Sequence, residues 1–482
     1  MLDLRPIGHV IGLLVAALGA TMLVPMGFDL VAGNGHWPVF FECAVITVLA
    51  GGLIALACAN AVTGRLTLQQ TFLLASSVWL VLPLFGALPF LLGATGARPV
   101  DAVFEAMSGL TTTGSTVFSG LDDLPQGLLL WRSMLQWFGG IGIIVVAMVF
   151  LPELRVGGMQ IFRSEAFDTG GKVLPRAAEI AARIAAAYVG LTVACHFAYL
   201  AVGMTGYEAL NHALTTLSTG GFSTYDASFG AFQGPPEYVA SVFMVLAGLP
   251  FVRYVQVMAG SVRPLWQDVQ VRGFFWAIVV LVLTVTAYRV IANDDNLEHA
   301  LREGLFNVTS IITGTGYASV DYQLWGTFPM VLFFFIGLIG GCAGSTSCSV
   351  KIFRYQILVA AIRAEIRRIH SPSGMFTPRY DGKPVGDDVI DSVIAFFVIF
   401  VLSLGLFAVA LSLTGLDMVT SVSGAATAIA NIGPGLGPII GPAGNFGALN
   451  DTAKWLLTLA MFLGRLELLV VMVVVLPRFW RV

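Results

Sequence analysis

Ten long apolar stretches constrain the fold of this chain more than any other feature of its sequence. They run approximately over residues 8–30, 38–62, 70–93, 127–151, 179–203, 237–260, 274–292, 325–343, 389–413 and 453–477. A helix needs about 20 mostly apolar residues to cross a bilayer, and continuous apolar runs argue against a transmembrane barrel, whose strands alternate. Charged residues make up only 11% of the chain. The sequence therefore predicts an all-α polytopic membrane protein with ten transmembrane helices.

Charge placement orients these predicted helices in the membrane. Most of the 25 Lys and Arg residues fall at one set of helix ends, including the segments 155–183, 253–272 and 351–383. The opposite connections carry mainly acidic residues, such as Asp122 and Asp226. By the positive-inside rule, the basic ends face the cytoplasm. We therefore expect both termini to be cytoplasmic and the acidic connections to face outward.

A Gly- and Thr-rich pentapeptide interrupts the apolar sequence four times. The copies occupy residues 111–115, 218–222, 313–317 and 432–436. Aligned in this way, each copy has Gly in its fourth place, at Gly114, Gly221, Gly316 and Gly435. A degenerate repeat at such regular spacing predicts four copies of one structural unit.

Each pentapeptide follows a semi-apolar segment of helix length, at 101–111, 207–217, 299–311 and 417–430. These segments are too short to cross a bilayer and fit re-entrant half-helices. In three copies an acidic residue stands thirteen positions before the fourth-place Gly, at Asp101, Glu208 and Glu303. A carboxylate at the start of a half-helix would offset the positive end of its dipole. The fourth copy has Val422 at this place and Asp417 upstream, which predicts a shifted start.

The pentapeptides suit a cation pore. Irregular backbone at membrane depth is tolerated only inside protein or beside a water-filled cavity. Glycine can adopt positive φ, so that successive carbonyls face one way, and a ring of carbonyls can replace the hydration shell of a potassium ion. The predicted potassium filter residues are Thr112, Thr113, Gly114, Thr219, Gly220, Gly221, Thr313, Gly314, Thr315, Gly316, Asn431, Ile432, Gly433 and Gly435.

With these motifs the chain resembles the TrkH-type membrane subunit of the Trk/Ktr/HKT superfamily of potassium transporters. The third and fourth loops, Ile-Thr-Gly-Thr-Gly-Tyr-Ala-Ser and Ala-Asn-Ile-Gly-Pro-Gly-Leu-Gly, carry the most specific match. The resemblance implies two leading transmembrane helices and four helix–pore-loop–helix units arranged by pseudo-fourfold symmetry around one pore. The implied boundaries are 1–66 for the leading helices and 67–170, 171–272, 273–383 and 384–482 for the units.

A Gly- and Ser-rich run at 337–349 is expected to break the second helix of the third unit, because glycine and serine weaken helices. It resembles the intramembrane loop of the family, which lies under the filter. The predicted gate residues are Gly340, Gly341, Gly344, Ser345, Thr346, Ser347 and Arg465. Two alternatives stay open, a close helix-packing face of small residues for the run and a local ion pair with Glu467 or another acid for Arg465.

The resemblance implies potassium uptake across a bacterial cytoplasmic (inner) membrane, with K⁺ as the transported ion and no other cofactor in the chain. Potassium symport with H⁺ or Na⁺, or a Na⁺-permeable relative, remains an alternative, and a non-conducting scaffold is less favoured. The sequence has no cluster of catalytic residue types, so we do not expect an enzyme. The expected partners are the lipid bilayer, a second copy in a homodimer and a cytoplasmic nucleotide-binding TrkA-type subunit, with no nucleic acid.

Overall fold

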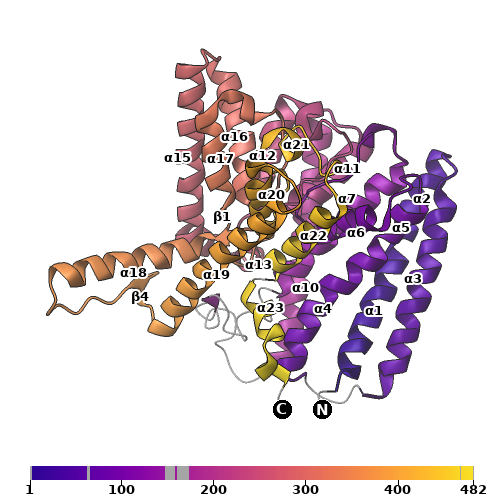
Figure 1. Cartoon of the computed structure of the whole chain (residues 1–482), viewed down its shortest axis with the longest axis horizontal. Helices are drawn as coiled ribbons and strands as arrows, with labels where there is room; N and C mark the ends of the chain where they lie inside the picture. The colour runs from indigo at the N-terminus through magenta and orange to yellow at the C-terminus, as the bar shows by residue number, and fades with distance from the viewer. Residues whose placement is uncertain (1–2, 62–65, 147–157, 160–172, 467, 481–482) are drawn as a thin grey trace.

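The computed structural model describes residues 3–61, 66–146, 158–159, 173–466 and 468–480. This part of the chain is predominantly helical, as predicted. Its β-strands form two short pairs, one parallel between β1 (Ile339–Gly340) and β2 (Val350–Lys351) and one antiparallel between β3 (Arg379–Tyr380) and β4 (Lys383–Pro384). The two ends of the chain lie at the same end of the molecule (Figure 1).

The N-terminal helices form a layer at one side of the molecule (Figure 1). They are α1 (Arg5–Thr21), α2 (Leu23–Ala32), α3 (Trp37–Cys58), α4 (Leu68–Gly86) and α5 (Leu88–Leu92). Helices α1 and α3 pack closely because glycines face each other where they cross. A Cβ on Gly12 would lie 2.5 Å from the Ala55 nitrogen, and one on Gly51 would overlap the Ala16 nitrogen. Small residues at such a crossing let the two backbones approach.

Four helices end at the predicted loops and form the centre of the fold. They are α6 (Pro99–Leu110), α11 (Gly206–Leu217), α16 (Leu297–Thr313) and α20 (Met418–Ala430). The helices that flank or connect them are α7 (Gln126–Val145), α10 (Val173–Ala201), α12 (Pro235–Ala247), α13 (Phe251–Met258), α14 (Arg263–Gln267), α15 (Val269–Ala292), α17 (Thr327–Gly337), α18 (Ile352–His370), α19 (Asp387–Ser412), α21 (Gly437–Ile440), α22 (Asp451–Arg465) and α23 (Leu468–Val475).

Six helical segments of the described chain are long and apolar enough to span a membrane, and the count rises to eight if two bent helix pairs are each one span. One bent pair is α12 with α13, which turn by 92° at a break that contains Pro250. Proline lacks the backbone donor that a continuous helix needs. Of the other predicted spans, 127–151 overlaps α7, and its residues 147–151 lie outside the described residues, whereas 325–343 corresponds to the 11-residue α17.

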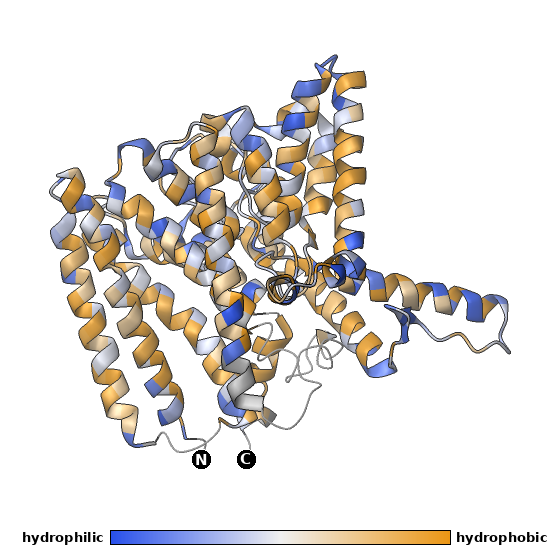
Figure 2. Ribbon diagram, turned by 180° about the vertical axis from the view of Figure 1, so that it is seen from behind, coloured by the Kyte–Doolittle hydropathy of each residue, from blue (hydrophilic) through white to orange (hydrophobic). Residues whose placement is uncertain are grey.

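The outer faces of the helices are strongly apolar (Figure 2). Leu53, Leu56, Phe197 and Leu406 are each more than 60% exposed. A soluble protein rarely exposes an apolar surface this extensive, and lipid is the environment that suits it. The hydropathy of the surface therefore agrees with the predicted membrane location.

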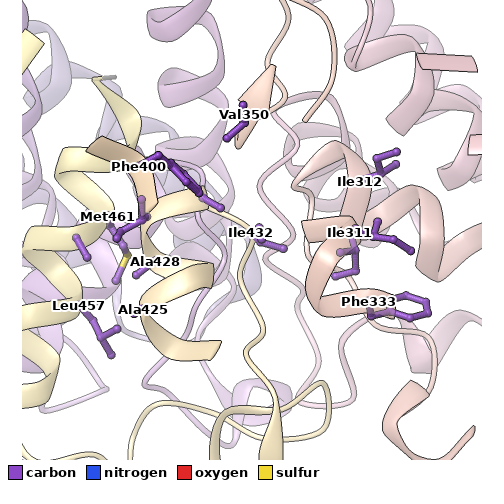
Figure 3. Close-up of a cluster of buried hydrophobic side chains, with 14 of the residues drawn as sticks. Ile311, Ile312, Phe333, Val350, Phe400, Ala425, Ala428, Ile432, Leu457 and Met461 are labelled. Atoms are coloured by element: carbon purple, nitrogen blue, oxygen red, sulfur yellow. The ribbon is translucent and has the colours of Figure 1, made fainter. Parts of the chain in front are cut away.

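Among the described residues, the buried apolar cluster with the most members takes most of them from the chain between Val271 and Val471, and the rest from the helices and loops before it. Ile311 and Phe333 of α16 and α17 lie on one side of Ile432, and Ala428 and Met461 of α20 and α22 lie on the other (Figure 3). Helix α17 ends at Gly337, where the predicted interruption begins, and helical structure resumes at Ile352. The chain between them passes beneath the four loops and belongs to the site described next.

Candidate functional site

The four half-helices end in the same backbone motif. A left-handed residue follows each helix or its last turn, namely Thr112 (φ 52°), Thr219 (50°), Gly314 (72°) and Asn431 (51°). The N–H of the following residue donates to the carbonyl five positions earlier, in the bonds Thr113 to Ser108 (2.9 Å), Gly220 to Thr215 (2.9 Å), Thr315 to Ser310 (2.8 Å) and Ile432 to Thr427 (3.0 Å). This is a Schellman cap, which satisfies carbonyls that a helix end leaves unpaired.

A glycine with positive φ stands two residues after each left-handed cap residue, and the four glycines meet in a closed ring. The glycines are Gly114 (φ 88°), Gly221 (77°), Gly316 (82°) and Gly433 (115°). A Cβ on the first three would overlap the carbonyl oxygens of Gly220, Thr315 and Ile432 respectively, and one on Gly433 would lie 2.9 Å from the Thr113 oxygen. Each loop therefore contacts the next in chain order, and the fourth contacts the first.

The fourth ring position is occupied by Gly433, and the sequence alignment that placed Gly435 there is wrong by two residues. Gly435 has no left-handed φ, its N–H donates to the Ile440 carbonyl (2.7 Å), and a Cβ on it would meet the Ile440 side chain. The cause is the helix end, because α20 is capped by Asn431 and the ring glycine follows that cap at a set spacing. Pattern matching favoured the wrong Gly of Gly433-Pro434-Gly435.

A cavity of about 230 Å³ opens on one side of the ring. All four ring glycines line it, together with polar groups that include Arg132, Tyr225, Asp226 and Asn445. The Tyr225 hydroxyl donates to Glu208, and this bond raises the pKa of Tyr225 to about 12. We call this cavity the outer vestibule.

On the other side of the ring lies the interrupted segment 338–349. Within it, Cys348 is closest to the ring, because its Sγ lies 3.5 Å from the Thr112 Oγ1 and a Cβ on Gly314 would lie 3.1 Å from the Cys348 Cβ. The Ser349 N–H donates to the Ala430 carbonyl at the end of α20 (2.9 Å). The segment thus touches the first, third and fourth loops or their helices.

Backbone hydrogen bonds tie the same segment to the second unit. The Cys342 N–H donates to the Gly248 carbonyl (3.0 Å), and the Phe251 N–H donates to the Gly344 carbonyl (2.9 Å). Both partners belong to the bend between α12 and α13. The predicted gate residues Gly340, Gly341, Gly344, Ser345, Thr346 and Ser347 are all buried in this segment.

Arg465, at the end of α22, joins the segment to the first unit. Its Nη1 donates to the Cys348 Sγ (2.8 Å) and its Nη2 to the Gly139 carbonyl (3.0 Å), and the side chain is 4% exposed. Glu467, the alternative partner weighed from the sequence, lies outside the described residues. Arg465 therefore contacts the interrupted segment itself, as the gate hypothesis requires.

The acidic residues near the starts of the half-helices form hydrogen bonds and ion pairs with specific partners. Asp101 accepts from Lys454 (2.6 Å), and Glu208 forms a capping box with Thr205. Glu303 corrects the sequence-based expectation, because α16 begins at Leu297 and Glu303 lies in its second turn, where it pairs with Arg289 (2.7 Å). Asn296 caps that helix, so the start is earlier than the acidic residue suggests.

The sequence analysis overlooked Arg132 of α7, a charged residue that lines the outer vestibule. Its side chain is 1% exposed and pairs with the fully buried Glu105 (2.8 Å). Its Nη1 also donates to the Ser223 carbonyl (2.9 Å), so it links the first and second loops. The available signal was an arginine inside the apolar stretch 127–151, since a charge within a spanning segment usually has a partner.

Known cation and potassium transport proteins are similar to this chain over nearly its whole length. The profile of the TrkH family, described as a cation transport protein, matches residues 36–481. The chain is 42% identical to the Trk system potassium uptake protein TrkI of Halomonas elongata, over 99% of this chain and 97% of that protein. It is 34% identical to the Trk system potassium uptake protein TrkH of Escherichia coli, over 99% of each.

A solved structure matches over the whole length. The crystal structure of the potassium transporter TrkH from Vibrio parahaemolyticus superposes with a TM-score of 0.90 at 33% identity and covers 100% of both chains. The arrangement of helices around the four loops is thus similar to that of a potassium transporter.

Proposed function

Because the chain belongs to the TrkH family of cation transport proteins, we propose that it carries potassium into the cell across the bacterial inner membrane through a channel-like pore. The selectivity filter of this pore is the ring made by Gly114, Gly221, Gly316 and Gly433. The observation that carries the proposal is the closed contact of the four loops, each with a left-handed glycine against the carbonyl oxygen of its neighbour.

The filter follows from the backbone of these loops. Each loop alternates a left-handed residue, an ordinary one and a left-handed glycine. This alternation lets successive carbonyls turn toward one axis, where they replace water around a dehydrated potassium ion. The repeated Schellman caps, with the same spacing in all four loops, support pseudo-fourfold symmetry about that axis. The carbonyl ends of the half-helix dipoles add a favourable field for a cation.

The direction of transport follows from charge. Both chain ends lie at the end of the molecule away from helix α21 (Figure 1), and Ile440 of that helix lines the outer vestibule. The basic connections belong to the same end of the helices as the termini in the charge pattern of the sequence. By the positive-inside rule that side is cytoplasmic, and the vestibule faces outward. The membrane potential supplies about 2.3 kcal/mol per charge per 100 mV for inward movement of K⁺.

Expression of the chain in a bacterial strain that lacks its own potassium uptake systems is expected to restore growth at limiting potassium. Failure to restore growth, although the protein is inserted in the membrane, would contradict the proposal. Reversal potentials measured in K⁺, Na⁺ and H⁺ gradients separate a potassium channel from the alternatives, symport with H⁺ or Na⁺ and a Na⁺-permeable pore.

The interrupted segment 338–349 is the gate in this proposal. It crosses beneath the ring and contacts elements of all four units, so it obstructs the path of an ion that has passed the filter. The bond from Arg465 to the Cys348 Sγ holds the segment in place. For the gate to open, the bond from Arg465 to Cys348 and the backbone bonds to Gly248 and Phe251 must break.

Deletion of residues 345–347 is expected to raise potassium flux at least severalfold, because it shortens the obstruction without touching the ring. Arg465→Ala is expected to act in the same direction by releasing Cys348. Flux is measured as ⁸⁶Rb⁺ or K⁺ uptake into proteoliposomes, normalised to inserted protein. Deletion of Asp381 and Gly382, in the exposed turn between β3 and β4, is the matched control. Unchanged flux in both gate variants would remove the gating role.

Partners complete the proposal. We propose as partners a second copy in a homodimer, in which each protomer has its own pore, and a TrkA-type nucleotide-binding subunit, which are the partners that the resemblance to the family implies. The basic segments 155–183, 253–272 and 351–383 are the surfaces we assign to that subunit, and most of the first segment up to residue 172 lies outside the described residues. Helix α18 supports this assignment, because Arg363, Arg367 and Arg368 lie along it.

A further inference from the structure

The second loop differs from the other three at the residue before the ring glycine. Thr113 and Thr315 hold this place in the first and third loops, and each hydroxyl lies 2.7 Å from the hydroxyl of the threonine two residues earlier. Ile432 holds it in the fourth loop and packs in the apolar cluster shown in Figure 3. The second loop has Gly220, which offers no side chain.

Gln136 of α7 occupies the space that a side chain at position 220 would fill. A Cβ built on Gly220 would overlap the Cδ and Oε1 of Gln136. The Gln136 Nε2 donates to the Gly220 carbonyl (2.6 Å), and its Oε1 accepts from the Phe222 N–H (3.0 Å). The side chain is fully buried. One amide thus binds the backbone on both sides of the ring glycine Gly221.

We propose that Gln136 is a positioning residue that supplies the missing side-chain support of the second loop and thereby sets the ion selectivity of the ring. The inference rests on the proposed function of the ring as a potassium filter. The Gly220 oxygen is the one that the ring glycine of the first loop approaches. A donor bound to that oxygen fixes the direction of the carbonyl, and the direction decides how well it replaces water around K⁺.

The arrangement is specific to this loop. Gln136 belongs to the first unit and binds the second, so it also joins two neighbouring units behind the ring. Gly220 has ordinary φ, and the amide, rather than backbone conformation, is what excludes a larger residue there. Gln136 and Gly220 therefore act as a pair, in which the amide fills the space that a side chain at position 220 would occupy.

Gln136→Met tests the role, because methionine keeps the volume and removes both hydrogen bonds. The K⁺ over Na⁺ permeability ratio, from reversal potentials of the purified full-length chain in proteoliposomes, is expected to fall roughly tenfold, the factor that corresponds to one buried hydrogen bond. A ratio equal to that of the parent chain would overturn the inference, since a merely structural bond changes stability and leaves selectivity alone.

The chain offers a matched control in Gln323. Its Oε1 accepts from the Gly437 N–H (2.6 Å) and its Nε2 donates to the Gly437 carbonyl (3.4 Å). Gln323 thus makes the same kind of paired hydrogen bonds from a side-chain amide to the backbone, but outside the ring. Gln323→Met is expected to leave the permeability ratio unchanged. A fall in the permeability ratio as large as that of Gln136→Met would show that the loss of any such pair of hydrogen bonds disturbs selectivity, which contradicts a specific role of Gln136.

A double substitution gives a second, independent test. Gly220→Thr alone is expected to disrupt the second loop, whereas Gly220→Thr with Gln136→Ala provides the side chain of the first and third loops and the space for it. The double variant is expected to recover most of the permeability ratio. Recovery no better than Gln136→Ala alone overturns the inference.

The permeability ratio of Gly316→Ser, measured in the same way, separates the proposal that the ring is the filter from the proposal that Gln136 positions the second loop. If Gly316→Ser lowers the ratio and Gln136→Met does not, Gln136 has no role in selectivity and the filter stands. If neither changes it, the ring is not the filter.

Discussion

Gly316→Ser is expected to abolish potassium-limited growth of an uptake-deficient strain that depends on this chain. The backbone φ at Gly316 is 82°, a conformation that costs a non-glycine residue roughly 1–2 kcal/mol. A Cβ would in addition overlap the Ile432 carbonyl oxygen, which is one of the oxygens proposed to face the ion. The substitution therefore displaces the neighbouring loop and damages the filter at two of its four positions.

The ring geometry predicts a graded series among the four glycines. Gly221→Ser is expected to be as severe as Gly316→Ser, since the added Cβ would overlap the Thr315 oxygen. Gly433→Ser is expected to be the mildest, because the nearest oxygen lies 2.9 Å from the added atom. Growth rate at a series of potassium concentrations, together with the K⁺ over Na⁺ reversal potential, ranks the variants.

Gly435→Ala is the matched control for this series. Its added Cβ would meet the Ile440 side chain and no ring oxygen. Growth is expected to remain close to that of the parent chain. Loss of growth in Gly435→Ala with full growth in Gly433→Ala would contradict the ring assignment and favour the original sequence alignment.

Arg132→Met is expected to lower the free energy of unfolding by about 3–5 kcal/mol, the cost of leaving one partner of a buried ion pair without the other. Glu105 is fully buried and its Oε1 lies 2.8 Å from the Arg132 Nε. The guanidinium also donates to the Ser223 carbonyl and lies 4.1 Å from the centroid of the Phe222 ring. Its loss therefore weakens the first and second loops together. Thermal unfolding in detergent measures the effect.

Two companion variants make this result specific. Arg132→Met with Glu105→Gln is expected to recover much of the lost stability, because the double change removes the unpaired charge as well. Arg368→Ala, in an ion pair with Glu365 whose side chains are more than half exposed, is expected to change stability by less than about 1 kcal/mol. Equal unfolding temperatures for Arg132→Met and Arg368→Ala would show that the buried pair contributes no more than a surface one.

Local patterns in the sequence predicted a good part of the site. The half-helices α6, α11, α16 and α20 and the interruption after Gly337 lie where the sequence predicted them, because length, hydropathy and glycine content act within a few residues. The register of the fourth loop was predicted wrongly, since Gly433 and Gly435 are equivalent in pattern and differ only in their distance from the cap at Asn431. Arg132 and Gln136 were overlooked, because their partners are 16 or more positions away.

The sequence by itself determined that this chain is a helical membrane protein, because a bilayer leaves few alternatives to a long apolar segment. It also identified the loops and the broken helix, since Gly, Ser and Thr disfavour helix wherever they cluster. Only the tertiary structure decided which glycines meet, which carbonyl each one approaches and which buried side chains hold them. Those choices depend on contacts between units far apart in the chain, and such contacts leave no periodic signal in the sequence.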